Sequence, residues 1–343
     1  MKIVEVRTSK QLTEFLSLNN RSTWEEETTN EFFWPLKHQE ACRDEDFDQR
    51  REWAFALCKE GRSLYWDHLD DVLEIYTPSS DGVLQDEVRN LITRVILRVV
   101  FGKELDLSLA QKALKEYDRR IKLTKLKDTQ LRTTFVGCFS QHIKDAWIDP
   151  DPRSLLAIAK KNFPLSENLL HQLISVFMIT GTIQLSDATI HCLLSSENFT
   201  QTMMKFPLNK FLTREGKNGE IYSLRPETFN KLEVRTGEGC GKWLFGDGPR
   251  RCPAIYFAPK FVEHLANFYR EFNFNIADIQ HSRSLDIDIP FSTENTPKIS
   301  WGSKVGAKVT YWFNVCVLGL VAQKRRFWKY LNNPETYVVL IND

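Results

Sequence analysis

Cysteine is scarce and scattered in this sequence of 343 residues. Its seven cysteines are too few and too scattered for a disulfide scaffold, and none forms a Cys-x-x-Cys pair, which argues against a structural zinc site. No apolar run follows the first basic residue, and the uncharged apolar run at 309–322 is shorter than the roughly 20 residues of a spanning helix. We therefore expect no signal peptide, no transmembrane segment and a reducing, cytoplasmic setting.

A strong net charge is also absent. The 46 Lys and Arg residues nearly balance the 45 Asp and Glu residues, for a formal net charge of +1. This balance argues against a nucleic-acid partner bound through bulk charge, because such proteins carry a marked excess of basic residues. With 42% hydrophobic and 27% charged residues, the chain has the composition of a folded protein rather than a disordered one.

Apolar residues at helical spacing predict a mainly α-helical chain. The most regular helix covers residues 83–101, and Gly102 lies just past its end, where a C-terminal glycine is favoured. The same spacing predicts helices over 47–76 and 107–126. A short strand is expected near residues 3–6.

A long helix is predicted over about residues 166–195. Its apolar side chains lie around most of the circumference, so it should run through the centre of the protein. Gly181 in its middle costs about 1 kcal/mol relative to alanine, which indicates the close approach of a flat group.

The pattern becomes irregular between Pro207 and Phe245. A further helix is predicted from Pro253 to about residue 272, in which Pro259 should be uncomfortable because it removes an internal hydrogen bond. Strands and turns are expected in the remainder.

The segment 243–254 carries the residues with the clearest chemistry. Cys252 precedes a predicted helix, and a helix N-terminus favours the thiolate form. Gly246 and Gly248 predict a tight loop, and Arg250 and Arg251 offer charge to an anionic group. A thiolate with backbone N–H groups directed at it suits a soft metal centre.

This segment resembles the haem-binding loop of cytochromes P450, Phe-x-x-Gly-x-Arg-x-Cys-x-Gly, with Ala tolerated at the last position. The pattern is met by Phe245, Gly248, Arg250, Cys252 and Ala254. The resemblance implies haem b, with Cys252 as the axial thiolate ligand of the iron and Arg250 paired with a propionate. It also implies that Phe245 packs beneath the porphyrin.

Other segments resemble the family in the same order. His38 lies about where some members place a propionate-binding histidine, and 86–102 resembles a helix that ends in a Phe-Gly pair. The helix at 166–195 resembles the one that crosses the distal face of the haem, and 225–229 resembles a Pro-Glu-Arg-Phe element.

The resemblance implies a mainly α fold class, a shortened cytochrome P450-like fold with a long central helix and a small β portion. It also implies one haem-binding domain over residues 1–343, with 1–45 and 308–343 as atypical peripheral segments.

The candidate distal catalytic residues are Thr180, Gly181, Thr182 and Gln184. In the family, an acid and a threonine usually follow the glycine and deliver protons during dioxygen activation. Ile183 and Gln184 stand in their place. An isoleucine cannot carry a proton, and a glutamine can only orient water through hydrogen bonds.

Four further features depart from the family. No Glu between Thr182 and Cys252 is followed three residues later by Arg, so the usual Glu-x-x-Arg pair is absent there, and Thr228 replaces the Arg of the Pro-Glu-Arg-Phe element. Phe261 also replaces the Glu expected after the cysteine. Gly181 and Cys252 are only 71 residues apart, which is short for the family.

Three functions remain open, ranked in this order. The first is a haem-thiolate monooxygenase or oxidase acting on a small or carrier-bound metabolite, with a ferredoxin or flavin reductase as the implied partner. The second is an isomerase, dehydratase or peroxide-using enzyme that activates no dioxygen, which the lost acid–alcohol pair favours. The third is a non-catalytic relative that acts as a binding partner, which the lost Glu-x-x-Arg pair favours.

Overall fold

The structure is a computed structural model. It describes residues 3–18, 47–122, 129–272, 275–276 and 289–292, with gaps in the third range at 196, 207, 209–211, 217, 226–227, 229–230, 233–243 and 247. Within these residues the chain is mainly helical with two small β-sheets, which confirms the predicted fold class.

The helices cover most of the described chain. They are α1 (Ser9–Ser17), α3 (Phe47–Glu60), α4 (Arg62–Ile75), α5 (Leu84–Phe101), α6 (Ser108–Lys122), α7 (Thr129–Ile148), α8 (Leu155–Asn162), α9 (Glu167–His171), α10 (Thr182–Leu194), α11 (Phe199–Lys205) and α14 (Ala258–Glu271). A π-helical segment and two short 3₁₀ turns complete them: η1 (Gln172–Gly181), η2 (Gly248–Arg250) and η3 (Pro253–Tyr256).

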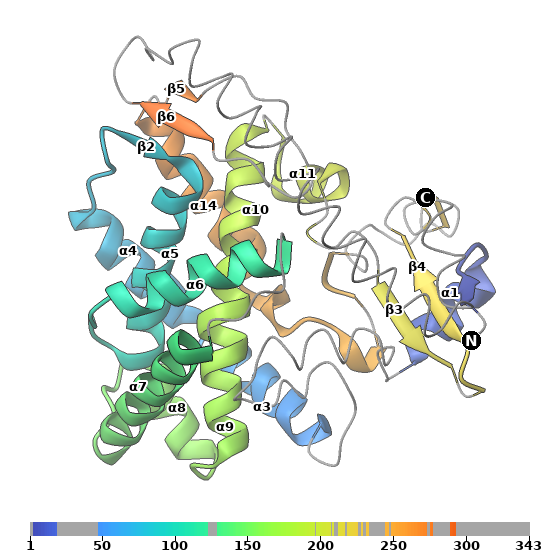
Figure 1. Cartoon of the computed structure of the whole chain (residues 1–343), viewed down its shortest axis with the longest axis horizontal. Helices are drawn as coiled ribbons and strands as arrows, with labels where there is room; N and C mark the ends of the chain where they lie inside the picture. The colour runs from blue at the N-terminus through green and yellow to red at the C-terminus, as the bar shows by residue number, and fades with distance from the viewer. Residues whose placement is uncertain are drawn as a thin grey trace.

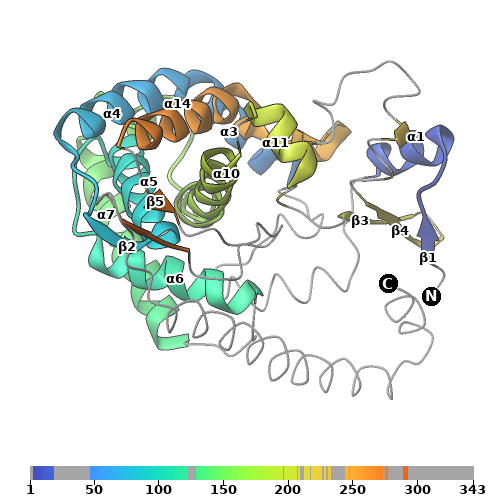
Figure 2. The same cartoon turned by 90° about the horizontal axis from the view of Figure 1, so that it is seen from above.

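The central helix is formed by α9, η1 and α10 in one continuous run, Glu167–Leu194, as the sequence predicts. Ser166 caps its start by accepting the Leu169 N–H at 3.3 Å. By length and composition this helix could cross a membrane, but most of it is buried inside the fold, as expected of a core helix. Figure 2 looks along α10, with α4, α5 and α14 on one side of it.

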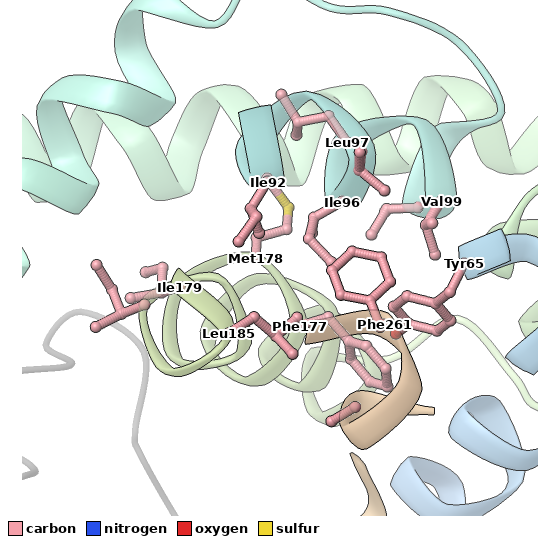
Figure 3. Close-up of a cluster of buried hydrophobic side chains, with 14 of the residues drawn as sticks. Tyr65, Ile92, Ile96, Leu97, Val99, Phe177, Met178, Ile179, Leu185 and Phe261 are labelled. Carbon is pink, nitrogen blue, oxygen red and sulfur yellow. The ribbon is translucent and has the colours of Figure 1, made fainter. Parts of the chain in front are cut away.

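The main core lies between the central helix, α5 and α14. Almost every residue of α5 is buried, and Gly102 ends the helix in the left-handed region, with φ 77°. Figure 3 shows Ile92 and Ile96 of α5 meeting Met178 and Phe261 from the facing helices. Burial of these side chains fixes the central helix against α5 and α14.

Two three-stranded sheets lie outside this helical core. The first has the order β1 (Ile3–Glu5), β4 (Ile221–Leu224), β3 (Leu212–Glu215), with β1 parallel to β4 and β3 antiparallel to it. Figure 1 shows this sheet beside α1, away from the main helical body. The second sheet has the order β2 (Asp81–Val83), β6 (Pro290–Ser292), β5 (Asn275–Ile276).

Several predicted boundaries change in the structure. The single helix predicted over 47–76 is two helices that separate at Gly61, and α6 is described only as far as Lys122. The segment predicted as irregular after Pro207 contains β3 and β4, because its short strands pair with each other and with β1 across a long sequence separation. Helices α7 and α8 were not predicted.

The helix after the cysteine also begins differently. It starts as the 3₁₀ turn η3, and the α-helix proper begins at Ala258. Pro259 therefore lies in the first turn, where a missing N–H group breaks no internal hydrogen bond. The expectation that Pro259 would be uncomfortable was wrong for this reason.

Candidate haem-binding site

The cysteine loop folds tightly between Phe245 and Cys252. The Cys252 N–H donates to the Phe245 carbonyl at 2.5 Å, and the Arg251 N–H donates to the Gly248 carbonyl at 3.1 Å. Gly246 and Gly248 have φ angles of 69° and 70°, which favour glycine. The loop thus presents a half-buried Cys252 immediately before η3.

Gly248 also has a steric reason to be glycine. A Cβ atom on this residue would lie 2.2 Å from the carbonyl oxygen of Leu16, near the end of α1. No side chain fits in that space, so α1 and the cysteine loop are in direct backbone contact. No sequence pattern indicates that the N-terminal helix contacts this loop.

Arginines from two segments gather beside Cys252. The Arg250 guanidinium lies 4.7 Å from the centroid of the Phe47 ring, and Arg51 donates to the carbonyl of Arg251. Arg50, next to Arg51 in α3, is fully buried and donates instead to Asn168 Oδ1 in α9 at 3.5 Å. Guanidinium groups at this position suit the carboxylates of an anionic ligand.

Sequence reasoning missed Arg51 as a member of the site. The available signal was a pair of adjacent arginines near the start of a predicted helix, which by itself is typical of a solvated helix face. Only the tertiary contact between α3 and the segment around η3 brings Arg51 to the cysteine loop.

Aromatic rings surround the loop and the start of α14. Phe245 stacks on Phe199 of α11, with ring centroids 6.1 Å apart. Phe257 stacks on Tyr65 at 3.7 Å, and Phe261 meets Tyr65 edge-on at 6.2 Å. Burial, the largest cause, raises the pKa of Tyr65 well above its usual value, so this ring stays neutral.

Phe261 replaces an acid for a structural reason. Its side chain is fully buried in the core between α4, α14 and the central helix, as Figure 3 shows. A carboxylate in that position would lie among apolar side chains, at a high desolvation cost. The departure from the family pattern is therefore consistent with the packing around it.

The candidate distal residues lie where η1 passes into α10. Thr180, Gly181 and Gln184 are half-buried, whereas Thr182 is fully buried. Thr182 lies two residues from both Thr180 and Gln184, so helical geometry turns it to the opposite side of the axis. The structure thus groups Thr180 with Gln184 and separates Thr182 from both.

Gly181 ends the π-helical segment. A Cβ atom on it would lie 3.0 Å from the carbonyl oxygen of Val176, five residues earlier. The contact that excludes a side chain is therefore with the backbone of the same helix. The expected approach of a flat group stays a prediction.

Helix α14 connects the cysteine loop to the end of the central helix. Arg270 donates to the carbonyls of Cys192 and Ser195, the latter at 2.8 Å, where α10 ends. Glu263 accepts the N–H of Phe199 at 3.0 Å, where α11 begins. Both charges complement the dipole of the helix end they meet, so they cap α10 and α11.

The free cysteines of the described chain differ in environment. Cys58 and Cys192 are buried, whereas Cys138 and Cys252 are half-buried. Burial, the largest cause, raises the pKa of the Cys192 thiol to about 12, so that thiol stays protonated at neutral pH.

The residues of the loop fit a haem group by the chemistry of their donors. Cys252 offers one thiolate, and Arg250 and Arg51 offer cationic groups for carboxylates. His38 lies outside the described residues, as do most residues of the Pro-Glu-Arg-Phe-like element, 226–227 and 229.

Comparisons with known proteins agree with this geometry. No family model matches the sequence, and no curated protein matches it. Among solved structures, a retinoic acid-bound cyanobacterial cytochrome P450, CYP120A1, is 14% identical with a TM-score of 0.62, over 84% of this chain and 88% of that one. P450BioI, in complex with an acyl carrier protein ligated to hexadec-9Z-enoic acid, is 14% identical with a TM-score of 0.59, over 84% and 91%.

A third structure extends the similarity. A variant of cytochrome P450 OleT in complex with arachidonic acid is 11% identical with a TM-score of 0.57, over 87% of this chain and 90% of that one. Similarity at this level of identity concerns the fold, since one fold supports many activities. The similarity extends over most of this chain, and this chain has the cytochrome P450 fold.

Proposed function

We propose that this chain is a haem-thiolate oxidoreductase, a monooxygenase or oxidase that acts on a small or carrier-bound metabolite in the cytoplasm. The observation that carries the proposal is the position of Cys252 in a cytochrome P450 fold, half-buried at the start of the helix behind it and flanked by arginines. We take residues 1–343 to form a single haem-binding domain.

In this proposal Cys252 supplies the thiolate that binds the iron of haem b. Arg250 and Arg51 would hold the propionates, and His38 is a further candidate for that role. Phe245, Gly248 and Ala254 would shape the loop that holds the haem. Bound haem supplies oxygen chemistry in which one atom of dioxygen enters the substrate and the other leaves as water, with two electrons and two protons consumed.

The candidate distal residues determine which groups deliver protons. Ile183 offers no proton, so delivery depends on water molecules held by hydroxyl and amide groups. Thr180 and Gln184 share one side of the helix and serve that purpose, next to Gly181, which ends the π-helical segment. Thr182 lies on the opposite side, where its carbonyl accepts the Ser186 hydroxyl at 2.7 Å, so its part in proton delivery would be indirect.

Electrons come from a separate donor, a ferredoxin or a flavin reductase. Arg251 is exposed beside Cys252, and it suits an acidic donor. Neighbours with this fold carry a carrier-bound fatty acid, retinoic acid or arachidonic acid, which supports a small or carrier-bound organic substrate.

A second candidate function follows from Ile183 and Gln184. An enzyme that rearranges or dehydrates an already oxidised substrate, or uses peroxide, needs no acid–alcohol pair. In that case the same haem site would turn over without dioxygen and reductant.

Turnover under three conditions separates these functions. The haem-loaded protein is incubated with candidate substrates under dioxygen plus reductant and donor, under anaerobic peroxide, and with neither. A monooxygenase forms product only in the first condition, whereas product in the second or third supports the alternative. A protein that binds no haem under any expression condition would contradict both functions and leave a non-catalytic binding partner.

A further inference from the structure

The central helix carries a single acidic residue beyond its first turns. Between Gln172 and Leu194 the sequence contains no Lys, Arg or Glu, and Asp187 is the one acid. Asp187 is half-buried, and its Oδ1 atom is buried. A carboxylate placed inside a fold costs free energy, so an acid in a helix this apolar indicates a specific use.

Asp187 lies on the same side of the helix as Thr180 and Gln184. The backbone is α-helical from Gly181 onward, with φ −60° at that residue, and at 3.6 residues per turn the three positions fall within about 60° around the axis. All three residues are half-buried, whereas Leu185 between them is buried. Steps of three and four residues make their side chains neighbours along this side.

His191, four residues after Asp187, continues the same side toward the end of α10. Its ring is fully buried and stacks on Phe206, with the centroids 5.3 Å and the planes 5° apart. An imidazole can take up a proton at one nitrogen and release one from the other. The polar line, Thr180, Gln184, Asp187 and His191, thus joins two proton-exchanging groups to an amide and a hydroxyl.

The opposite side of the helix is packed in the apolar core. Figure 3 shows Leu185 among the core side chains, near Phe177. Leu185 comes two residues before Asp187, so the carboxylate lies on the other side of the axis. The polar line therefore faces away from the core with α5 and α14.

Charged groups on the helices beside α10 are engaged in other contacts. On α14, Glu263 accepts the Phe199 N–H at 3.0 Å, and Arg270 donates to carbonyls at the end of α10. On α11, Lys205 pairs with Glu197 at 2.5 Å. The neighbours that its own helix gives to the Asp187 carboxylate are the polar residues one turn away on either side.

We propose that Asp187 supplies protons to the distal side of the site, through water held by Gln184 and Thr180. The proposal rests on the proposed monooxygenase function and adds a residue to it. One O–H bond of the Asp187 carboxyl group breaks as that water accepts the proton. The carboxylate then takes a proton from the His191 imidazole, which regains one from solvent water, and no electrons move in these steps.

This role explains how the site could work with Ile183 at the usual acidic position. The hydroxyl of Thr180 and the amide of Gln184 hold water but supply no net proton, whereas a carboxyl group does. Asp187 comes four residues after Ile183, a displacement of about 6 Å along the axis. The acid is thus moved by one turn, with Gln184 between it and Thr180.

Dioxygen and peroxide separate proton delivery from general damage to the site. Reduction of dioxygen takes its protons from the protein and its water, whereas hydrogen peroxide brings two protons and two electrons with its oxygen atoms. The haem-loaded protein is tested for dioxygen reduction with electrons from an electrode, and for peroxide-driven oxidation of the phenol guaiacol. We expect Asp187→Asn to slow dioxygen reduction at least about tenfold and to change guaiacol oxidation less than about twofold.

Two further variants complete this comparison. Asp187→Glu keeps the acid and should restore dioxygen reduction to within about threefold of the wild type. The matched control Asp86→Asn removes a carboxylate that pairs with Lys115 at 2.8 Å, and should change neither rate more than about twofold. If Asp187→Asn does not fold by circular dichroism, Gln184→Leu interrupts the same line and should show the same selective loss.

Infrared spectroscopy gives a readout that needs no turnover. Photolysis of carbon monoxide from the reduced protein perturbs the groups that share hydrogen bonds with the ligand site, and a carboxyl group among them gives a difference band. We expect this band in the wild type and in Asp86→Asn, and its loss in Asp187→Asn.

Three results would overturn the proposal: equal effects of Asp187→Asn on dioxygen and peroxide reactions, no carboxyl band in the wild type, or a band that persists in Asp187→Asn. A wild type with thiolate-bound haem that reduces no dioxygen would also overturn it, and would support the second candidate function. A carbon monoxide spectrum without the thiolate band would instead contradict the haem-thiolate function itself, so the two failures are distinguishable.

Discussion

Individual residues explain where this chain departs from the family it resembles. Phe261 stands where an acid was expected because its side chain fills the core beside Tyr65. Gln184 and Ile183 leave the two usual distal positions without a proton-carrying group, and Thr180 remains near Gln184. The cysteine motif itself was readable from the sequence, because its residues lie within ten positions and need no tertiary contact to be recognised.

Restoring the acid at position 261 should destabilise the fold. We expect Phe261→Glu to lower the free energy of unfolding by at least about 3 kcal/mol, because a carboxyl group would enter an apolar core. The buried carboxyl would have a raised pKa, so the folded state would bind more protons than the unfolded state above about pH 4, and the loss would grow as the pH rises.

Urea unfolding at pH 5 and pH 8 measures this effect. The control Phe261→Leu keeps the site apolar and should cost only about 1 kcal/mol, equally at both pH values. A Glu variant as stable as the Leu variant would show that position 261 is solvated in solution.

The buried thiol of Cys192 should lower the stability of the folded protein at alkaline pH. Burial raises the pKa of its thiol from 9.0 to about 12, so the unfolded state loses this proton first as the pH rises. Its contribution is fully present below pH 9 and is lost between pH 9 and 12, by up to about 1.4 kcal/mol per pH unit. Stability curves of the wild type and Cys192→Ala over this range should converge toward pH 12; parallel curves would contradict the assignment.

At the scale of elements, the cysteine loop contacts one helix that the sequence did not connect with it. Helix α1 touches the loop at Gly248, whereas α14, which was predicted to follow the loop, carries the caps for α10 and α11. Leu244 packs against both the main core and the smaller core around α1. These contacts steady the loop in a chain that lacks the usual Glu-x-x-Arg pair between Thr182 and Cys252.

Gly248→Ala tests the contact between α1 and the loop. Gly219→Ala is the matched control, because Gly219 has a similar φ of 76° but nothing within 4 Å of an added Cβ atom. We expect the control to cost about 1 kcal/mol from backbone strain alone, and Gly248→Ala to cost at least about 2 kcal/mol more. Equal losses in thermal unfolding would mean that α1 does not press on the loop.

Arg270→Ala tests the cap at the end of α10. Removing the guanidinium leaves the carbonyls of Cys192 and Ser195 without this donor, and we expect a loss of about 1–3 kcal/mol in denaturant unfolding. Lys205→Ala breaks an exposed pair with Glu197 and should cost less than about 1 kcal/mol. If Arg270→Ala lowers stability no more than Lys205→Ala does, Arg270 does not cap α10.

Sequence patterns predicted the long helices but not their details. The helix at 84–101 was recognisable because a broad apolar face ends at Gly102, and the central helix because its apolar residues surround the axis. The π-helical segment was not predictable, since an apolar periodicity carries no information on hydrogen-bond register. Strands β3 and β4 were missed because their pairing with β1 is non-local.

At the scale of the whole molecule, the described chain combines a helical body with a small sheet beside α1, as Figure 1 shows. The cysteine motif and the cytochrome P450 fold are independent observations, since the fold similarity comes at 11–17% identity and extends over most of the chain. Their agreement is the reason for proposing Cys252 as the ligand of haem iron. Because α3 and α1 reach the cysteine loop only through tertiary contacts, their positions in the site could not be predicted from the sequence.

The absorption spectrum of the reduced, carbon monoxide-treated protein tests this central claim most directly. Protein expressed with a haem precursor should show the strongly red-shifted Soret band of thiolate ligation. Cys252→Ser should lose that band, whereas Cys138→Ser, at a similarly half-buried cysteine in α7, should keep it. Bound haem without the band in the wild type, or a band that survives in Cys252→Ser, would contradict the assignment of Cys252 as the iron ligand.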